Sequence, residues 1–348
     1  MTSCPFEKIP QQEPGQIEEV ADLTEKLQNK RYPKPERILR GVHPKSHGCV
    51  AANFEVNADI DQSLQVGLFS RPGAKYQAWV RFSNASATVG PDLVDSKNGS
   101  RGMALKVLDV AGDEAVLLDD GGARSQDFLM INTPAFAFVN LPDYLRLNQI
   151  LLENNDDPSM FFAPLGTEVP GITEEDIERI KRSAAVVGGI QSKPVANPLG
   201  VQYFGAAPFL FGADRIMRFS AEPVGGAQPQ VLPDDPSPNY LREALAAQMS
   251  ETSDIVFDFK LQVRGSDEEG LGIEDATTVW DEEEFPFVNV ATITVSAPQD
   301  VGTETVKEGC EQLVFTPWHS LESHRPLGRI NRLRKQVYQT SADHRETP

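Results

Sequence analysis

The sequence lacks long apolar runs and an excess of basic charge. No stretch approaches the roughly 18 consecutive apolar residues that cross a bilayer, so we expect no transmembrane helix. Residues 1–8 contain neither the basic nor the apolar region of a secretory signal, which favours a cytoplasmic protein. The 51 acidic residues outnumber the 32 basic ones and give a net charge of −19. Such a surface should repel phosphate backbones and anionic lipids, so we expect neither nucleic acid nor a membrane as a partner.

Cysteine is scarce, and the motifs of several other chemistries are missing. Cys4, Cys49 and Cys310 are odd in number and lack the close spacing of a metal site. We therefore expect buried or free thiols and no disulfide framework. The sequence also has no phosphate-binding Gly-x-x-x-x-Gly-Lys-[Ser/Thr] loop, no His-Glu-x-x-His motif and no nucleophile elbow.

What is present suits a large globular core. The 348 residues are 40% hydrophobic and 24% charged, which is ordinary for a globular protein. We expect residues 1–36 to form a polar arm that contains one helix, over about residues 16–29. Alternating patterns predict strands at 77–83, 102–108, 127–131, 216–223, 255–263 and 288–295, and helices are expected from 141, from 173, near 239–249 and after 328. Strands with long connections and flanking helices fit a closed antiparallel barrel in an α+β protein.

A pair of residues near the end of the sequence points to a specific chemistry. Arg334 precedes Tyr338 by one helical turn, so its guanidinium can lie against the phenol ring or oxygen. A fixed positive charge favours the phenolate, a hard anionic ligand suited to ferric iron. Taken alone, however, such a pair is more typical of an ordinary surface helix.

Three upstream segments give the pair a context: Arg40-Gly-Val-His43, Val80-Arg-Phe-Ser83 and Ile131-Asn-Thr-Pro134. In this order, the four segments together resemble the haem catalase family. Ser100–Lys106, Thr278–Trp280 and Phe285–Val290 extend the resemblance, which covers about residues 37–345. The most similar branch comprises the short catalase-related haem proteins, which include the allene oxide synthase-like domains.

The resemblance implies a fold and a cofactor. It predicts a catalase-like eight-stranded antiparallel β-barrel with flanking helices over residues 37–348, preceded by the arm at 1–36. Full-length catalases continue beyond the iron-binding helix, whereas ten residues follow Tyr338 here, so we expect a minimal core that lacks the C-terminal helical extensions. The implied cofactor is haem b.

The resemblance also assigns roles at the iron. Tyr338 is the predicted axial ligand, with Arg334 holding it deprotonated. His43 is the predicted catalytic base, because imidazole can take a proton from one peroxide oxygen and return it to the other. Ser83 would hydrogen-bond His43 and fix its ring. His47, four residues further on, is expected to be a solvated loop residue.

Three arginines are the implied partners of the haem propionates. Arg40, Arg81 and Arg345 occupy the matching positions, and each can grip a carboxylate with two hydrogen bonds. Arg345 lies close to the end of the sequence, where a helix frays most readily.

The residues expected beside His43, on the peroxide-binding side of the haem, leave one alternative open. The family has two consecutive asparagines before Thr-Pro, with the first beside the iron, and those positions here are Ile131 and Asn132. Strict alignment puts Ile131 at the catalytic place, whereas a one-residue shift of the strand would bring in Asn132. Phe136 is expected either to wall the pocket or to pack in the core. Val42 lies directly before the histidine. A valine there resembles the catalases, because the allene oxide synthase-like members have threonine at this position.

These resemblances imply a haem peroxidase with weak catalase activity. Its substrates would be a small-molecule peroxide, either hydrogen peroxide or a fatty-acid hydroperoxide, and a reductant. Two alternatives stay open: a hydroperoxide isomerase or lyase of the allene oxide synthase type, and a non-enzymatic haem-binding module. The sequence identifies no reductant, and it leaves a homo-oligomer open.

Overall fold

The computed structural model describes residues 6–33, 36–94 and 97–346. Its strands are β1 (Ser46–Val56), β2 (Lys75–Asn84), β3 (Leu93–Val94), β4 (Lys97–Asn98), β5 (Arg101–Val107), β6 (Gln126–Ile131), β7 (Tyr203–Phe204), β8 (Phe209–Phe211), β9 (Arg215–Pro223), β10 (Ile255–Gly265) and β11 (Val288–Val295). Its α-helices are α1 (Glu13–Arg31), α2 (Leu141–Glu153), α3 (Ser159–Phe162), α4 (Glu174–Gln191), α5 (Tyr240–Met249), α6 (Glu304–Gln312) and α7 (Gly328–Glu346).

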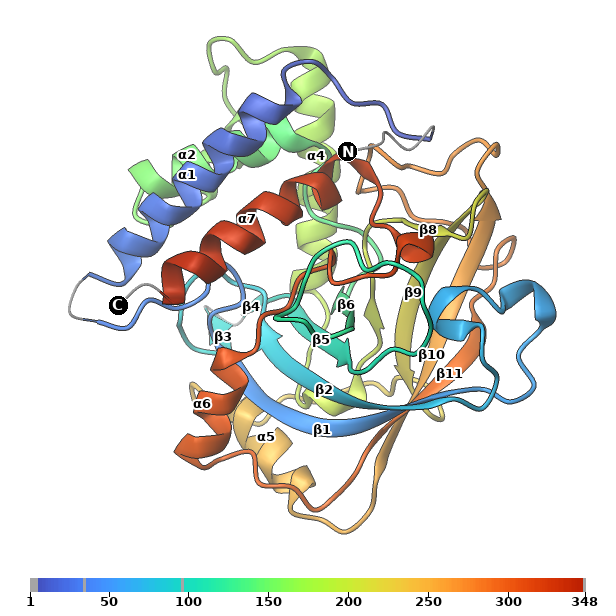
Figure 1. The fold of residues 1–348 in the computed structure, drawn as a ribbon. Helices are drawn as coiled ribbons and strands as arrows, with labels where there is room; N and C mark the ends of the chain where they lie inside the picture. Colours follow the sequence, from blue (N-terminus) through green and yellow to red (C-terminus); the bar gives the residue numbers. More distant parts are fainter. Residues whose placement is uncertain (1–5, 34–35, 95–96, 347–348) are drawn as a thin grey trace.

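Eight of the strands close into an antiparallel barrel (Figure 1). Hydrogen bonds connect them in the order β10-β11-β1-β2-β5-β6-β7-β9, and β9 then pairs back with β10. The closing pair runs from Arg215 opposite Gly265 to Pro223 opposite Phe257. β8 is an additional strand on β9, and β3 pairs with β4 as a separate ribbon. The predicted α+β fold with a closed eight-stranded barrel is confirmed.

Phenylalanine rings fill the interior of the barrel. Phe128 and Phe259 meet there with ring centroids 4.7 Å apart, and Phe82 belongs to the same fully buried cluster. Burying each such side chain stabilises the fold by about 1.5–3 kcal/mol. Because successive side chains of a strand point to opposite faces, Arg81 and Ser83 of β2 project away from this interior.

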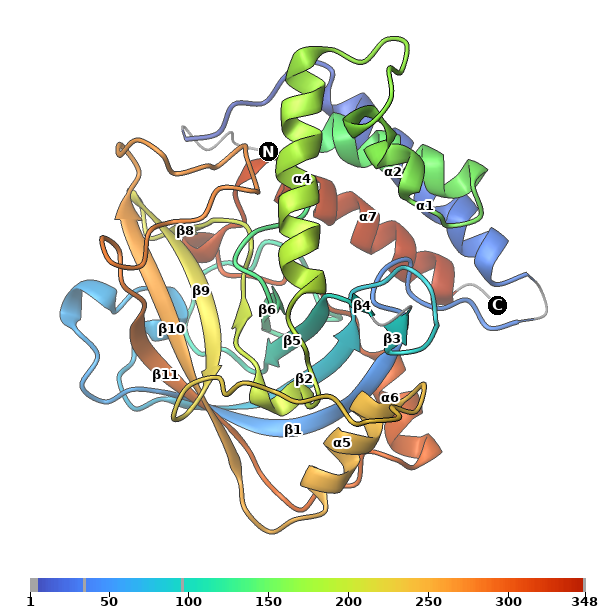
Figure 2. The same cartoon turned by 180° about the vertical axis from the view of Figure 1, so that it is seen from behind.

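A layer of helices covers one side of the barrel. Figures 1 and 2 show α1, α2, α4 and α7 in this layer, while α5 and α6 lie beside β1 away from it. Within the layer α7 packs against α1. The buried Arg332 of α7 binds Glu13 and Glu274, each at 2.9 Å, and also Glu7. Removing one partner from a buried ion-pair network is strongly destabilising, so these contacts fix the N-terminal helix to α7.

Most of the predicted elements are confirmed. The expected N-terminal helix is α1, slightly longer at both ends, and the other expected helices are α2, α4, α5 and α7. The six expected strands are β2, β5, β6, β9, β10 and β11. The sequence did not predict the polar helix α6 or the short strands β7 and β8. Among the described residues, none of the helices has the length and apolar character that a membrane crossing demands.

Two expectations about side chains are wrong. His47 is not solvated: it lies in β1 with no exposed surface, and its Nε2 is 2.9 Å from Asn84 Oδ1. Cys49 and Cys310 are not free thiols, because a disulfide joins them across 261 positions of sequence. A separation so long leaves no local spacing signal. Disulfides are rare in cytosolic proteins, so this one does not favour the predicted cytoplasmic location, which stays a prediction.

Candidate active site

A cavity of about 590 Å³ lies between β2, β5 and β6 of the barrel and helices α1, α2, α4 and α7. This volume falls in the range of about 300–1,000 Å³ that is usual for pockets holding small molecules and cofactors. Apart from Asn132, every predicted site residue lines it: Arg40, Val42, His43, Arg81, Ser83, Phe136, Arg334, Tyr338 and Arg345. Segments from both ends of the sequence and from its middle therefore meet around one space.

His43 is held in a strained loop that precedes β1. Its φ of +56° is in the left-handed region, which residues other than glycine seldom adopt. The His43 N–H donates to Ser86 O at 3.2 Å, and Arg81 Nη2 donates to His43 O at 2.9 Å. The ring Nδ1 lies 2.9 Å from Ser83 Oγ, so the predicted contact with Ser83 is present. Strain of this kind persists only where the surroundings fix it, and here they fix the position of an imidazole in the cavity wall.

The surroundings of His43 also keep its imidazole neutral. Burial lowers the pKa of His43 to about 3, and the nearby positive charges of Arg81, Arg334 and Arg40 act in the same direction. The ring is therefore unprotonated near neutral pH and can accept a proton. With Nδ1 bonded to Ser83, Nε2 is the nitrogen available for that role.

Helix α7 brings Arg334 and Tyr338 to the cavity. It begins at Gly328, where φ is +83° and an added Cβ would lie only 1.9 Å from Ile273 O, so only glycine fits. The guanidinium carbon of Arg334 lies 5.3 Å from the centroid of the Tyr338 ring, and its Nη1 donates to Asn331 Oδ1 at 3.1 Å. The contact between the two side chains that the sequence spacing predicted is present, and it is made to the ring face.

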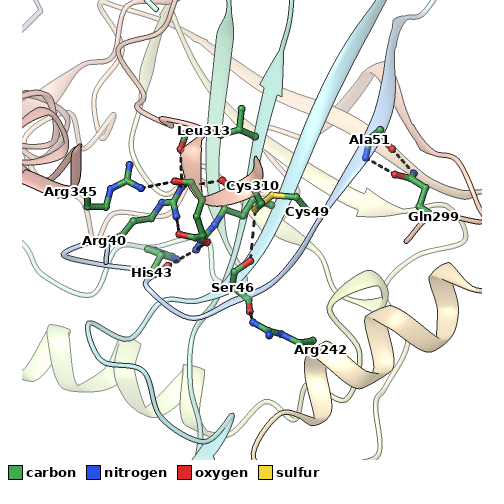
Figure 3. Close-up of a disulfide and its surroundings, with 12 residues drawn as sticks. Arg40, His43, Ser46, Cys49, Ala51, Arg242, Gln299, Cys310, Leu313 and Arg345 are labelled. Atoms are coloured by element: carbon green, nitrogen blue, oxygen red, sulfur yellow. Dashed lines mark hydrogen bonds and ion pairs between the residues drawn. A yellow bond between two sulfur atoms is a disulfide. The ribbon is translucent and has the colours of Figure 1, made fainter. Parts of the chain in front are cut away.

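The three arginines matched to propionates gather around one residue, Glu311. Arg40 and Arg81 form ion pairs with Glu311, with Arg81 Nη2 at 3.2 Å from Oε1. Arg345 Nη1 donates to the Glu311 backbone oxygen at 2.8 Å (Figure 3). Burial opposes ionisation of Glu311, but Arg81 and Arg40 outweigh it, so the pKa of Glu311 is lowered. We call Arg40, Arg81 and Arg345 the arginine cluster.

The structure brings Ile131 to the cavity wall and leaves Asn132 outside it. Asn132 Oδ1 accepts hydrogen bonds from Arg101 N at 2.8 Å and Ser100 Oγ at 3.3 Å. Ile131, its neighbour, lines the cavity. Since adjacent residues of an extended chain face opposite sides, both side chains cannot reach the same space. Phe136 is in the wall as well.

The sequence did not predict three residues that shape the site. Arg31 of α1 donates to Asp156 Oδ1 at 2.6 Å and to Gly41 O at 3.1 Å. Tyr144 of α2 is a second phenol in the wall, and burial raises its pKa to about 12. Glu311, which binds the arginine cluster from outside the cavity wall, is the third. None of them belongs to a recognisable motif, and only the amphipathic pattern of α1 and α2 hints that these helices cover something apolar.

Comparisons with known proteins identify the fold. No protein-family model matches the sequence. No curated protein matches it either. Similar solved structures include a fungal catalase, with a TM-score of 0.67 and 17% identity, covering 90% of this chain and 61% of that one. Catalase A from Saccharomyces cerevisiae gives 0.65 and 16%, covering 90% and 62%, and a bacterial catalase gives 0.64 and 17%, covering 99% and 64%.

These similarities show a catalase-like fold. At 16–17% identity they establish the arrangement of the barrel and its helices and not a shared activity. The chain spans less than two thirds of the length of these catalases.

Proposed function

We propose that this protein is a haem-dependent peroxidase that reduces hydrogen peroxide or organic hydroperoxides, including those of fatty acids. One observation carries the proposal: His43 with its Ser83 partner and Tyr338 with its Arg334 partner line the same cavity. A neutral imidazole and a phenol beside a guanidinium are the two groups that peroxide cleavage at a tyrosine-ligated haem requires. The catalase-like fold supports the same cofactor.

The residues of the cavity fit haem b. Leu129, Phe136 and Val337 offer apolar contact to a porphyrin face. The arginine cluster carries three positive charges and the Glu311 carboxylate one negative charge. Their net charge of +2 would balance the two propionates of haem b. Arg81 Nε, although buried, has no hydrogen-bond partner within the described part of the chain, so the arginine cluster keeps an unused donor.

Each group then has a distinct task. Tyr338 would supply the phenolate oxygen to the iron, and Arg334 would stabilise its negative charge. Bound haem would contribute an iron centre whose two-electron redox chemistry cleaves the peroxide O–O bond. His43 Nε2 would take the proton from one peroxide oxygen and deliver it to the other, which leaves as water or an alcohol. Ser83 keeps the ring oriented for both transfers.

Ile131 in the wall favours reduction of peroxide over its dismutation. An isoleucine donates no hydrogen bond, so a second hydrogen peroxide molecule would be held less well than by an asparagine at this place. The apolar part of the cavity, which includes Phe138, Leu147, Leu151 and Phe162, instead suits the hydrocarbon part of an organic hydroperoxide. We therefore propose that peroxidase activity exceeds catalase activity.

Gly102 provides a direct test of the position of His43. An added Cβ at this residue would lie 2.6 Å from His43 Nδ1 and 2.9 Å from Ser83 Oγ. Gly102→Ala is expected to displace the imidazole and slow the reaction with peroxide by about 10–100-fold, because small misplacements of catalytic groups are costly. Stopped-flow absorbance measures the rate. Gly90→Ala is the matched control, because a Cβ there meets no atom within 4 Å; equal rates in both variants would contradict the arrangement.

The central experiment reconstitutes the protein with haem b and records its absorption spectrum before and after a small excess of peroxide. We expect a phenolate-ligated ferric spectrum, rapid spectral change with peroxide, and turnover of a chromogenic electron donor. Stable haem without turnover would instead identify a binding module. With a polyunsaturated hydroperoxide we expect the alcohol as product; an epoxide formed without any reductant would identify an isomerase. Failure to bind haem would refute the proposal.

A further inference from the structure

The Cys49–Cys310 disulfide lies directly beside the arginine cluster. The bond, shown in Figure 3, joins β1 to the last turn of α6. The residue after Cys310 in the sequence is Glu311. Ser46 Oγ is 4.0 Å from Cys310 Sγ, and the same strand, β1, follows the strained loop that carries His43. One covalent bond therefore connects the two segments that bear the predicted base and the carboxylate of the cluster.

The chain at residues 310–313 orients the arginine cluster. Arg40 Nη2 donates to Leu313 O at 2.7 Å, and its other amino group pairs with the Glu311 carboxylate. Arg81 pairs with the same carboxylate, and Arg345 donates to the Glu311 backbone oxygen. All three guanidiniums thus depend on the position of one short segment.

Helix α6 is intrinsically weak, so the disulfide and the arginine contacts at residues 310–313 are what hold its last turn in place. It has nine residues, well below the length at which an isolated helix is stable in water, and Gly309 lowers its helix propensity further. Glu308 and Gly309 are exposed. The preceding loop is anchored to β1 by Gln299, which exchanges two hydrogen bonds with the backbone of Ala51 at 2.7 and 2.8 Å. The disulfide is the covalent anchor at the other end.

We propose that the Cys49–Cys310 disulfide is a redox-sensitive tether that keeps residues 310–313 in position and so preorganises the arginine cluster for a dicarboxylate cofactor. Reduction by a small dithiol transfers two electrons and two protons. One reagent sulfur attacks the disulfide, the second displaces it to form the reagent's own ring, and both cysteines become thiols. A hydroperoxide reverses the step: one thiolate forms a sulfenic acid and releases an alcohol or water, and the second thiol then displaces water to restore the bond.

Access to the disulfide controls how fast the tether responds. Cys49 is 3% exposed and Cys310 is 4% exposed, so a reagent must wait for α6 to open. Local opening of short surface elements needs far less free energy than global unfolding. Reduction is therefore expected to proceed in the folded protein, at a rate set by the opening of α6.

The first test follows hydrogen exchange in the protein without added haem, using a Cys4→Ala background so that only this disulfide responds. Dithiol treatment is expected to speed exchange of the backbone amides at 306–313. It should also speed exchange at Gly41 and His43, whose amides donate to Ser341 Oγ and Ser86 O. Cys310→Ala should reproduce the reduced pattern and then be insensitive to dithiol. Unchanged exchange after complete reduction would overturn the tether.

The second test concerns haem affinity and rests on the proposed function. Reduction should weaken haem b binding about tenfold, because ordering long side chains costs free energy that the tether otherwise saves. Glu311→Gln should weaken binding similarly, whereas Glu308→Gln, an exposed neighbour on α6, serves as the matched control. Equal affinity in the two redox states would overturn the coupling. If the oxidised protein binds no haem, the proposed function fails. Hydrogen exchange at residues 41, 43 and 306–313 then still shows whether the disulfide holds this segment in position.

Discussion

Replacing Tyr338 with phenylalanine is expected to abolish tight binding of ferric haem, with at least about a hundredfold loss of affinity and no phenolate-ligated spectrum. The change removes one oxygen atom and keeps the ring against Arg334, so packing within α7 is preserved. Loss of the only anionic donor proposed for the iron leaves apolar contact and the arginine cluster to hold the macrocycle. Absorption titration with haem b measures both the affinity and the ligand type.

Tyr144→Phe makes this result specific. Tyr144 is the other phenol identified in the cavity wall, and burial raises its pKa to about 12, which disfavours the anionic form a ligand needs. The variant is expected to retain the phenolate-ligated spectrum. If Tyr144→Phe lost that spectrum and Tyr338→Phe kept it, the iron ligand would belong to α2 and the proposed site would be wrong.

Replacing His43 with asparagine is expected to slow the reaction with peroxide by about 10²–10⁴-fold while haem binding persists. Asparagine tolerates the left-handed backbone at φ +56° better than alanine does, so the loop is kept and the base is removed. Stopped-flow absorbance after mixing with peroxide gives the rate. Ser83→Ala should give a smaller loss, because it frees the imidazole without removing it.

The pH dependence adds a second criterion for His43. Burial and the neighbouring arginines lower the pKa of His43 to about 3, so the ring stays unprotonated from about pH 5 upward. The wild-type rate should be level between pH 5 and 8 and fall as the ring gains a proton towards pH 3. An inflection near pH 6.5, or a wild-type rate in the asparagine variant, would show that another group is the base.

The sequence predicted those parts of the site that rest on local patterns. Strand alternation in β2 separates Arg81 and Ser83 from the barrel core, and the four-residue spacing in α7 stacks Arg334 on Tyr338. The choice between Ile131 and Asn132 could not be made in the same way. A shift of a single residue exchanges the two faces of a strand, and a linear pattern near the strand end does not fix that shift.

Long-range contacts were beyond the reach of local patterns. The position of Glu311 depends on where α6 docks, and the local pattern of a nine-residue helix does not specify which distant strand it packs against. The disulfide follows from the same docking, since its two cysteines are brought together only by the completed fold. His47 is buried because its polar partner, Asn84, is supplied by the neighbouring strand β2.

The hydrogen bond from Gly41 N to Ser341 Oγ joins residues that are 300 positions apart. The loop bearing His43 can therefore make this contact only after the chain has been synthesised as far as α7. Any group that binds in the cavity is accordingly enclosed late in folding, after these two distant segments have met.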